Sequence, residues 1–164
     1  MSAALTKARV QRTTFAAVVA IVFMLFVAFA AAYLERRAVP KEWVRIPVPR
    51  IAWLNLIVLA AASAAVEAYR RRGTGVRRAV ALATGALFLA LQAVAWQHCN
   101  AIGAGLSSSA HASFFFVVSG VHGAHVIGGL VALLWPGAPR GLVAGYWHFL
   151  GFSWLALLSL LTFL

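Results

Sequence analysis

The 164-residue sequence predicts an all-α fold: a polytopic membrane helix bundle with five transmembrane helices, built as a single domain over residues 1–164. One observation is composition, because 63% of the residues are hydrophobic and only 10% are charged. A soluble domain has about 45–50% apolar and about 25% charged residues, so this composition argues against a soluble globule. It also argues against disorder, since disordered chains are poor in apolar residues. The second observation is that five apolar windows approach the length of about 20 residues that crosses a bilayer.

The first two windows are separated by a basic, proline-containing segment. The window at 14–34 contains no charge and no proline. The window at 51–68 follows Pro47 and Pro49, which break regular structure, and its one charge is Glu67 near the end. Both windows are therefore predicted to be membrane-spanning helices.

Three more windows complete the bundle. They cover 79–97, 112–134 and 145–164, and the second of them stops at Trp135 and Pro136. Aromatic residues near span ends are expected to lie at the membrane interface. Those near the predicted ends are Trp43, Trp53, Trp96, Trp135, Tyr146 and Trp147.

The charges predict an orientation. The chain has 14 Lys and Arg against 3 Asp and Glu, and nearly all the cations lie between the windows. Nine lie on the side of the N-terminus and five on the other side, and an excess of Lys and Arg marks the cytoplasmic side. We therefore expect an integral protein of a bacterial inner membrane, with the N-terminus cytoplasmic, the C-terminus outside and no nucleic-acid partner. The nine are Lys7, Arg9, Arg12, Arg70, Arg71, Arg72, Arg77, Arg78 and Arg140; the five are Arg36, Arg37, Lys41, Arg45 and Arg50.

A few polar residues lie inside the windows, where function is first sought. Asn55, Ser63 and Gln92 are expected to form hydrogen bonds between helices. Glu67 lies next to an arginine cluster, so it is expected to form an ion pair at the membrane surface.

The fourth window combines small residues with histidines. Gly120, Ala124 and Gly128 recur every four residues and predict one face on which another helix packs closely. His122 and His125 are three residues apart and share a face. They are expected to be structural and, with His148 of the fifth window, to hold these two spans together.

The same histidines raise the alternative of a free-standing b-type cytochrome, because haem iron commonly takes axial histidines. On straight helices, however, His125 and His148 differ in depth by about 9 Å, since a helix rises about 1.5 Å per residue. Hydrogen bonding by neutral histidine is therefore the preferred interpretation.

Other chemistry receives little support. His98, Cys99 and His111 are expected in an outer loop, but adjacent His-Cys is not a recognised metal-ligand spacing and no carboxylate is near. The sequence lacks a phosphate-binding glycine loop and a His-Glu-x-x-His motif. No catalytic, cofactor-binding or metal-binding residue is predicted in this chain.

The fourth and fifth windows resemble subunit III of the haem–copper terminal oxidases. The run from Gly120 to Gly128 is similar to that family's Gly-Phe-His-Gly-x-His-Val-x-x-Gly motif. The second motif of the family, Tyr-Trp-His-Phe-Val-Asp-x-x-Trp, is matched by Tyr146, Trp147, His148, Phe149 and Trp154. Weaker matches include Asn55 and Gln92.

The resemblance implies a non-catalytic accessory subunit. Such a subunit stabilises the catalytic subunit I, which reduces oxygen to water and translocates protons in aerobic respiration. Subunits I and II are the expected partners, with haem and copper in the partner subunits. This chain would hold no cofactor of its own, and membrane phospholipids are candidate ligands. The family's quinol oxidase and nitric oxide reductase-associated homologues leave the electron donor open.

Two departures from the family pattern favour stabilisation over proton uptake. The window at 14–34 lacks the glutamate that the family often has there, and Gly151 replaces the aspartate of the second motif. The five spans resemble the last five of the family's seven-span form.

Overall fold

The computed structural model describes residues 2–39 and 43–164, without the side chains of residues 2–5, 7 and 8. This part of the chain is all-α and holds five helices, as the apolar windows predict. Their bounds are α1 Ser2–Arg37, α2 Arg50–Arg72, α3 Gly75–Ala101, α4 Ala110–Leu134 and α5 Arg140–Phe163.

All five helices are long and apolar enough to cross a membrane. Each helix extends beyond its predicted window at one or both ends. Polar and basic residues can continue a helix after the apolar run stops. In α2, for example, the helix runs through the three arginines that end at Arg72. Long basic side chains can keep their charged groups in water while their stems cover apolar surface. The protein is therefore an integral membrane protein.

Local signals set several helix ends. Gly73 follows α2 with a left-handed backbone (φ 63°), and its N–H donates to the Tyr69 carbonyl at 2.7 Å. Glycine is favoured there because it has no Cβ to strain this conformation. At the start of α4 the Ser109 hydroxyl accepts a hydrogen bond from the Ala112 N–H at 3.1 Å, which satisfies one free donor of the first turn.

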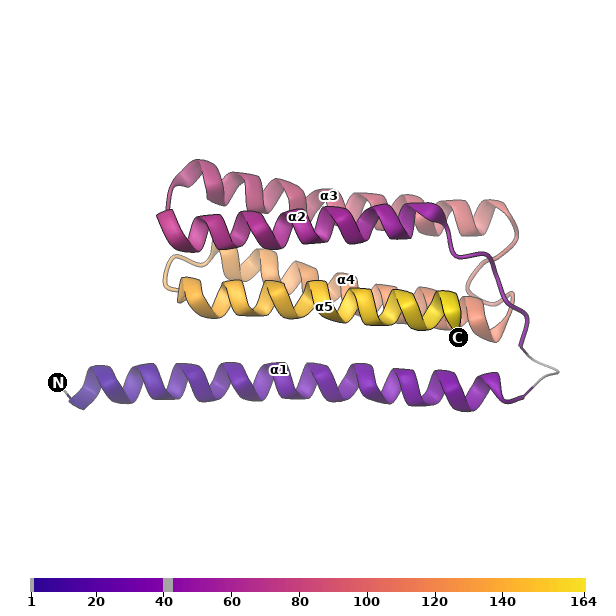
Figure 1. Ribbon diagram of the computed structural model, residues 1–164, viewed down its shortest axis with the longest axis horizontal. Helices are drawn as coiled ribbons and strands as arrows, with labels where there is room; N and C mark the ends of the chain where they lie inside the picture. Colours follow the sequence, from indigo (N-terminus) through magenta and orange to yellow (C-terminus); the bar gives the residue numbers. More distant parts are fainter. Residues whose placement is uncertain (1, 40–42) are drawn as a thin grey trace.

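The helices pack as two antiparallel pairs with one additional helix. Figure 1 shows α2 beside α3, with the α4–α5 pair against them and α1 along the other side of that pair. The largest buried cluster joins α2, α3, α4 and α5 and includes Leu59, Phe88, Val126, Trp147 and Trp154. Only 11% of the most apolar stretch of α1 is buried, so most of this helix presents apolar side chains to its surroundings.

The chain ends lie at opposite ends of the bundle (Figure 1). The N-terminus lies at the same end as the α2–α3 and α4–α5 connections, and the C-terminus lies with the other two connections. The arginines at 70–72, 77, 78 and 140 therefore gather at one end. Lys41, which is counted above on the opposite side, lies outside the described residues.

One interfacial assignment is wrong. Trp135 is 67% exposed next to the α4–α5 turn, as expected for an aromatic residue at the interface, but Trp147 is completely buried. Its indole fills space that Gly85 and Gly129 leave open on α3 and α4. Because these two glycines lack side chains, Trp147 packs in the core although it is near the start of α5.

Candidate functional site: polar contacts inside the bundle

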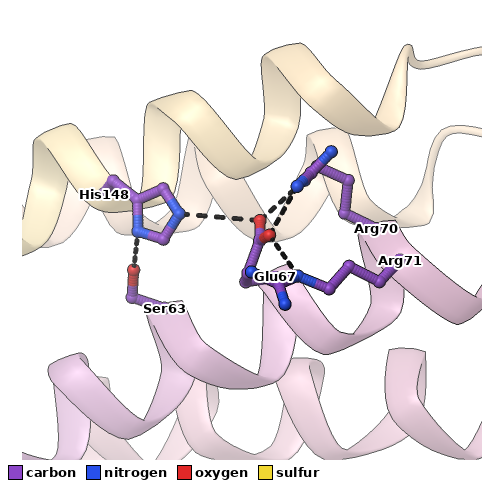
Figure 2. A network of polar contacts seen from close by, with 5 residues as sticks. All are labelled: Ser63, Glu67, Arg70, Arg71 and His148. Carbon is purple, nitrogen blue, oxygen red and sulfur yellow. Dashed lines mark hydrogen bonds and ion pairs between the residues drawn. The ribbon is translucent and has the colours of Figure 1, made fainter.

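A polar network lies where α2 approaches its C-terminal end, and we call Ser63, Glu67, Arg70, Arg71 and His148 the Glu67 network (Figure 2). Arg70 Nε and Arg71 Nε each donate to the Glu67 carboxylate at 2.7 Å. Residues three and four positions apart lie on one face of a helix, which explains how one carboxylate reaches both arginines. The ion pair predicted for Glu67 is therefore confirmed.

The fifth helix contributes the histidine of this network. His148 Nδ1 lies 2.6 Å from Ser63 Oγ, and His148 Nε2 lies 3.8 Å from Glu67 Oε2. The Glu67 side chain is 20% exposed and that of His148 is 53% exposed. The network is therefore partly exposed at the surface of the chain. His148 thus connects α5 to α2, and the prediction that it holds the fourth and fifth spans together is wrong.

The order Ser63, His148, Glu67 resembles a hydrolase relay in residue type but differs from it in geometry. A hydrogen bond between His148 and Glu67 would require a separation of about 3.2 Å or less, well below the observed 3.8 Å. The carboxylate already accepts hydrogen bonds from two arginines. The arrangement therefore supports an electrostatic and hydrogen-bonding tie between α2 and α5.

A second polar contact lies deeper between α2 and α3. Asn55 Nδ2 donates to Gln92 Oε1 at 3.1 Å, and the two residues are 0% and 2% exposed. The sequence prediction of interhelical hydrogen bonds is confirmed for this pair, and for Ser63 through its contact with His148.

The histidines of α4 lie on one face, as their spacing predicts, and Phe26 of α1 touches both rings. Its ring centroid is 6.0 Å from that of His122 and 5.6 Å from that of His125. His122 is fully buried and stacks on Trp154 with ring centroids 4.9 Å apart. Neither nitrogen of His122 has a hydrogen-bond partner among the described residues. Packing on Trp154 does connect His122 to α5, although no hydrogen bond contributes.

His125 uses a different kind of contact. Its Nδ1 lies 2.8 Å from the Val121 carbonyl of the same helix. The tie between α4 and α5 at this level comes from Tyr146, whose hydroxyl donates to the His125 carbonyl at 3.1 Å. The hydrogen bond that joins the two spans here is therefore made by the His125 backbone and Tyr146, and not by the His125 ring as predicted.

The small-residue face of α4 lies largely outside the contacts within the described chain, so close packing of another helix on it stays a prediction. Ala124 and Gly128 are exposed and Gly120 is partly buried beside Trp96. The glycines of α4 that are buried in the bundle are Gly123 and Gly129. A Cβ on Gly129 would lie 3.1 Å from Trp147, so this position determines how closely α5 approaches α4.

The three residues considered for a metal site lie in helices, which corrects the expected loop. His98 and Cys99 lie near the end of α3, while His111 lies in the first turn of α4 and is 1% exposed. No group of three metal-ligating side chains occurs within residues 2–39 and 43–164.

His111 has a structural role that the sequence did not reveal. Its Nδ1 accepts from the Ile46 N–H at 3.3 Å, and its Nε2 lies 3.0 Å from the Leu161 carbonyl. It thereby ties the α1–α2 connection to the end of α5. A histidine in the first turn of a helix has no local signal for such distant partners.

Comparison with known proteins adds the family. A protein of Nocardia farcinica named probable cytochrome c oxidase subunit 3 is 34% identical over 51% of this chain and 48% of its own length. The chain thus spans about half the length of that relative. Subunit 3 of Thermostichus vulcanus is 29% identical over 86% of this chain and 81% of its own length. No family model matches the chain.

The longer alignments decide the assignment. Cytochrome c oxidase subunit 3 of Synechocystis sp. is 30% identical to this chain, over 85% of the chain and 70% of the relative. An alignment of this extent includes most of the five helices, not one motif alone. The chain therefore belongs to the cytochrome c oxidase subunit 3 family.

Proposed function

We propose that the chain is a non-catalytic accessory subunit of a haem–copper oxidase complex, in which it stabilises the subunit that reduces oxygen to water and translocates protons. The observation that carries this proposal is the similarity to cytochrome c oxidase subunit 3 of Synechocystis sp. over 85% of the chain. The proposed partners are a catalytic subunit I, a subunit II and membrane lipids. The large exposed apolar residues on all five helices suit contact with lipid and with other membrane subunits.

We further propose that the partner subunits, and not this chain, bind the haem and copper of the complex. In the described part of the chain, the histidines of α4 and α5 do not face one another. Phe26 packs against His122 and His125, while His148 contacts Ser63 of α2. This arrangement does not fit a haem held by two axial histidines from facing helices.

The proposed location is a bacterial inner membrane, with the N-terminus in the cytoplasm. The support is the gathering of six arginines at the end of the bundle that also holds the N-terminus. An excess of arginine and lysine marks the cytoplasmic side of a membrane protein.

The test is purification of the tagged full-length chain in a mild detergent. We expect it to bring down a larger subunit with haem and copper, and the complex to consume oxygen with reduced cytochrome c as donor. Recovery of the chain alone would contradict the proposal. If the complex consumes oxygen with quinol but not with cytochrome c, the chain is still an accessory subunit. The expectation that cytochrome c is the electron donor would then be wrong.

An absorption spectrum of the isolated chain tests separately whether the chain itself binds haem. We expect no Soret band from the purified chain. A Soret band that disappears in His125→Ala would contradict the statement and favour a b-type cytochrome.

A further inference from the structure

His111 and its two hydrogen-bond partners lie at the end of the bundle that holds the C-terminus, and the function proposed above gives them no role. The Ile46 N–H donates to His111 Nδ1 at 3.3 Å, and His111 Nε2 lies 3.0 Å from the Leu161 carbonyl. We call these three residues the His111 latch. The latch joins residues 43–49, which lead into α2, to the first turn of α4 and the last turn of α5.

The two partners fix the protonation state of the His111 ring. A backbone N–H can only donate, so Nδ1 must accept from Ile46 and carries no proton. A carbonyl can only accept, so Nε2 must carry the proton that it donates to Leu161. The charged ring has a proton on both nitrogens, and the proton on Nδ1 would point at the Ile46 N–H. The closed latch therefore holds neutral imidazole in one tautomer, and protonation breaks its bond to Ile46.

No negative charge compensates for a second proton on His111. The ring is 1% exposed, and among the described residues no carboxylate lies within ion-pair distance of it. The titratable and charged groups that face it are Tyr33 of α1 and Arg45 of residues 43–49. Cys99 of α3 lies in the same buried cluster as Tyr33, and residues 157–164 of α5 have no titratable side chain. A charged His111 would therefore be buried without a counter-ion, which is costly.

The latch is also the polar anchor of residues 43–49. Within this segment the Ile46 N–H is the backbone donor that has a hydrogen-bond partner. Pro47 and Pro49 have no N–H to donate. The ring of Trp43 packs edge-on against those of Tyr33 and His111, which is a packing contact. Loss of the bond between Ile46 and His111 would therefore leave the segment held by packing alone.

We propose that the His111 latch is a pH-sensitive device, which holds residues 43–49 on the bundle while His111 is neutral and releases them when it is protonated. A histidine in water titrates near pH 6.5, so a released ring takes up a proton at mildly acid pH, whereas the closed latch has no place for one. The closed state is therefore favoured above about pH 6.5 and loses stability as the pH falls below it. In the proposed orientation this end of the bundle faces the outside, so acid on that side would open the latch. The latch itself depends on neither the orientation nor the partner subunits.

The test is hydrogen–deuterium exchange of the full-length chain in mild detergent, measured by mass spectrometry on a peptide that covers residues 43–49. At pH 8 and at pH 5 the exchange rate is divided by that of His111→Gln, so that the intrinsic pH dependence of exchange cancels. Glutamine can accept from Ile46 and donate to Leu161 but cannot gain a charge. We expect this ratio to rise by up to about 30-fold from pH 8 to pH 5, the factor for a released histidine with a pKa of about 6.5 that binds its proton only in the open state.

The matched control is His98→Gln, which removes another histidine at the same end of the bundle. His98 is exposed and lies beside Pro47 and Arg50, outside the latch. We expect His98→Gln to keep the wild-type pH dependence. Loss of that dependence in His98→Gln, or equal exchange of the wild type and His111→Gln at pH 5, would overturn the proposal.

A second ratio keeps the test independent of whether His111→Gln folds. In the wild type alone, exchange of residues 43–49 is divided by exchange of the α3–α4 connection at 102–109, which contains no histidine. We expect this ratio to rise from pH 8 to pH 5, while the helical circular dichroism and the exchange of α2 relative to the same connection stay constant. A constant ratio for residues 43–49, or an equal rise throughout α2, would contradict a local latch.

Discussion

Gly128 and Gly129 are adjacent in α4 but lie on different sides of the helix, and only the side of Gly129 packs inside the chain. Gly128 is exposed, and a Cβ there would meet nothing closer than the Tyr146 hydroxyl at 3.8 Å. A Cβ on Gly129 would lie 3.1 Å from the buried Trp147 indole. Because this ring is enclosed by other side chains, it has little room to move away.

We therefore expect Gly129→Val to destabilise the chain by about 1–3 kcal/mol, the usual cost of overpacking a core. Gly128→Val introduces the same side chain one position away and should have a much smaller effect. The measurement is unfolding in mixed detergent and SDS micelles, followed by tryptophan fluorescence. Equal destabilisation by both substitutions would show that α4 packs on a different face.

His122 is the second position where a single side chain can be tested. Its ring is fully buried and stacks on Trp154, and neither nitrogen has a partner among the described residues. A buried polar group without a partner costs about 1–3 kcal/mol. We expect His122→Phe to keep the ring contact and to raise the free energy of unfolding by up to this amount.

The matched control for this test is His125→Phe. His125 has a hydrogen-bond partner in the Val121 carbonyl, so its replacement should give no gain in stability. A clear loss of stability in His122→Phe would contradict the prediction and reveal a partner, such as a bound water, for the His122 ring.

At the scale of the helices, polar contacts join α2 to both of its main neighbours. Asn55 connects it to Gln92 of α3, and Ser63 connects it to His148 of α5. Hydrogen bonds between transmembrane helices contribute about 0.6 kcal/mol on average and at most about 1.7 kcal/mol. These contacts therefore select helix partners more than they determine total stability, which comes from the packing around residues such as Trp147.

The Asn55–Gln92 contact can be measured with a double-mutant cycle of Asn55→Ala, Gln92→Ala and both together. We expect a coupling energy of about 0.6–1.7 kcal/mol in the unfolding free energy. The cycle of Asn55→Ala with Ser63→Ala is the control, because these side chains have separate partners and should act additively. Additive effects of Asn55→Ala and Gln92→Ala would contradict the contact.

Sequence alone predicted the five helices because each apolar window is long enough to cross a bilayer. It placed helix ends less well, since the arginines at 70–72 continue α2 after the apolar run stops. It identified Ser63, Glu67 and His148 as polar residues but could not pair them. Helical periodicity shows which residues share a face; it does not show which face another helix covers. Gly120 and Gly128 share a face of α4, but Gly129, on another face, is the glycine that packs against Trp147 of α5.

For the whole molecule, the uneven distribution of charge becomes a prediction about orientation. The chain carries a formal net charge of +11, and its arginines concentrate at the end of the bundle that holds the N-terminus. The positive-inside tendency then predicts that this end lies in the cytoplasm.

Cysteine labelling can measure this orientation because the single native cysteine, Cys99, is 0% exposed and gives little background. Thr74 in the α2–α3 turn and Ser107 in the α3–α4 connection are exposed at opposite ends of the bundle. We expect a membrane-impermeant maleimide to label Ser107→Cys in spheroplasts and Thr74→Cys only in inverted membrane vesicles. The reverse pattern would invert the orientation. Labelling of both positions from one side would contradict the membrane crossing by α3 that separates them.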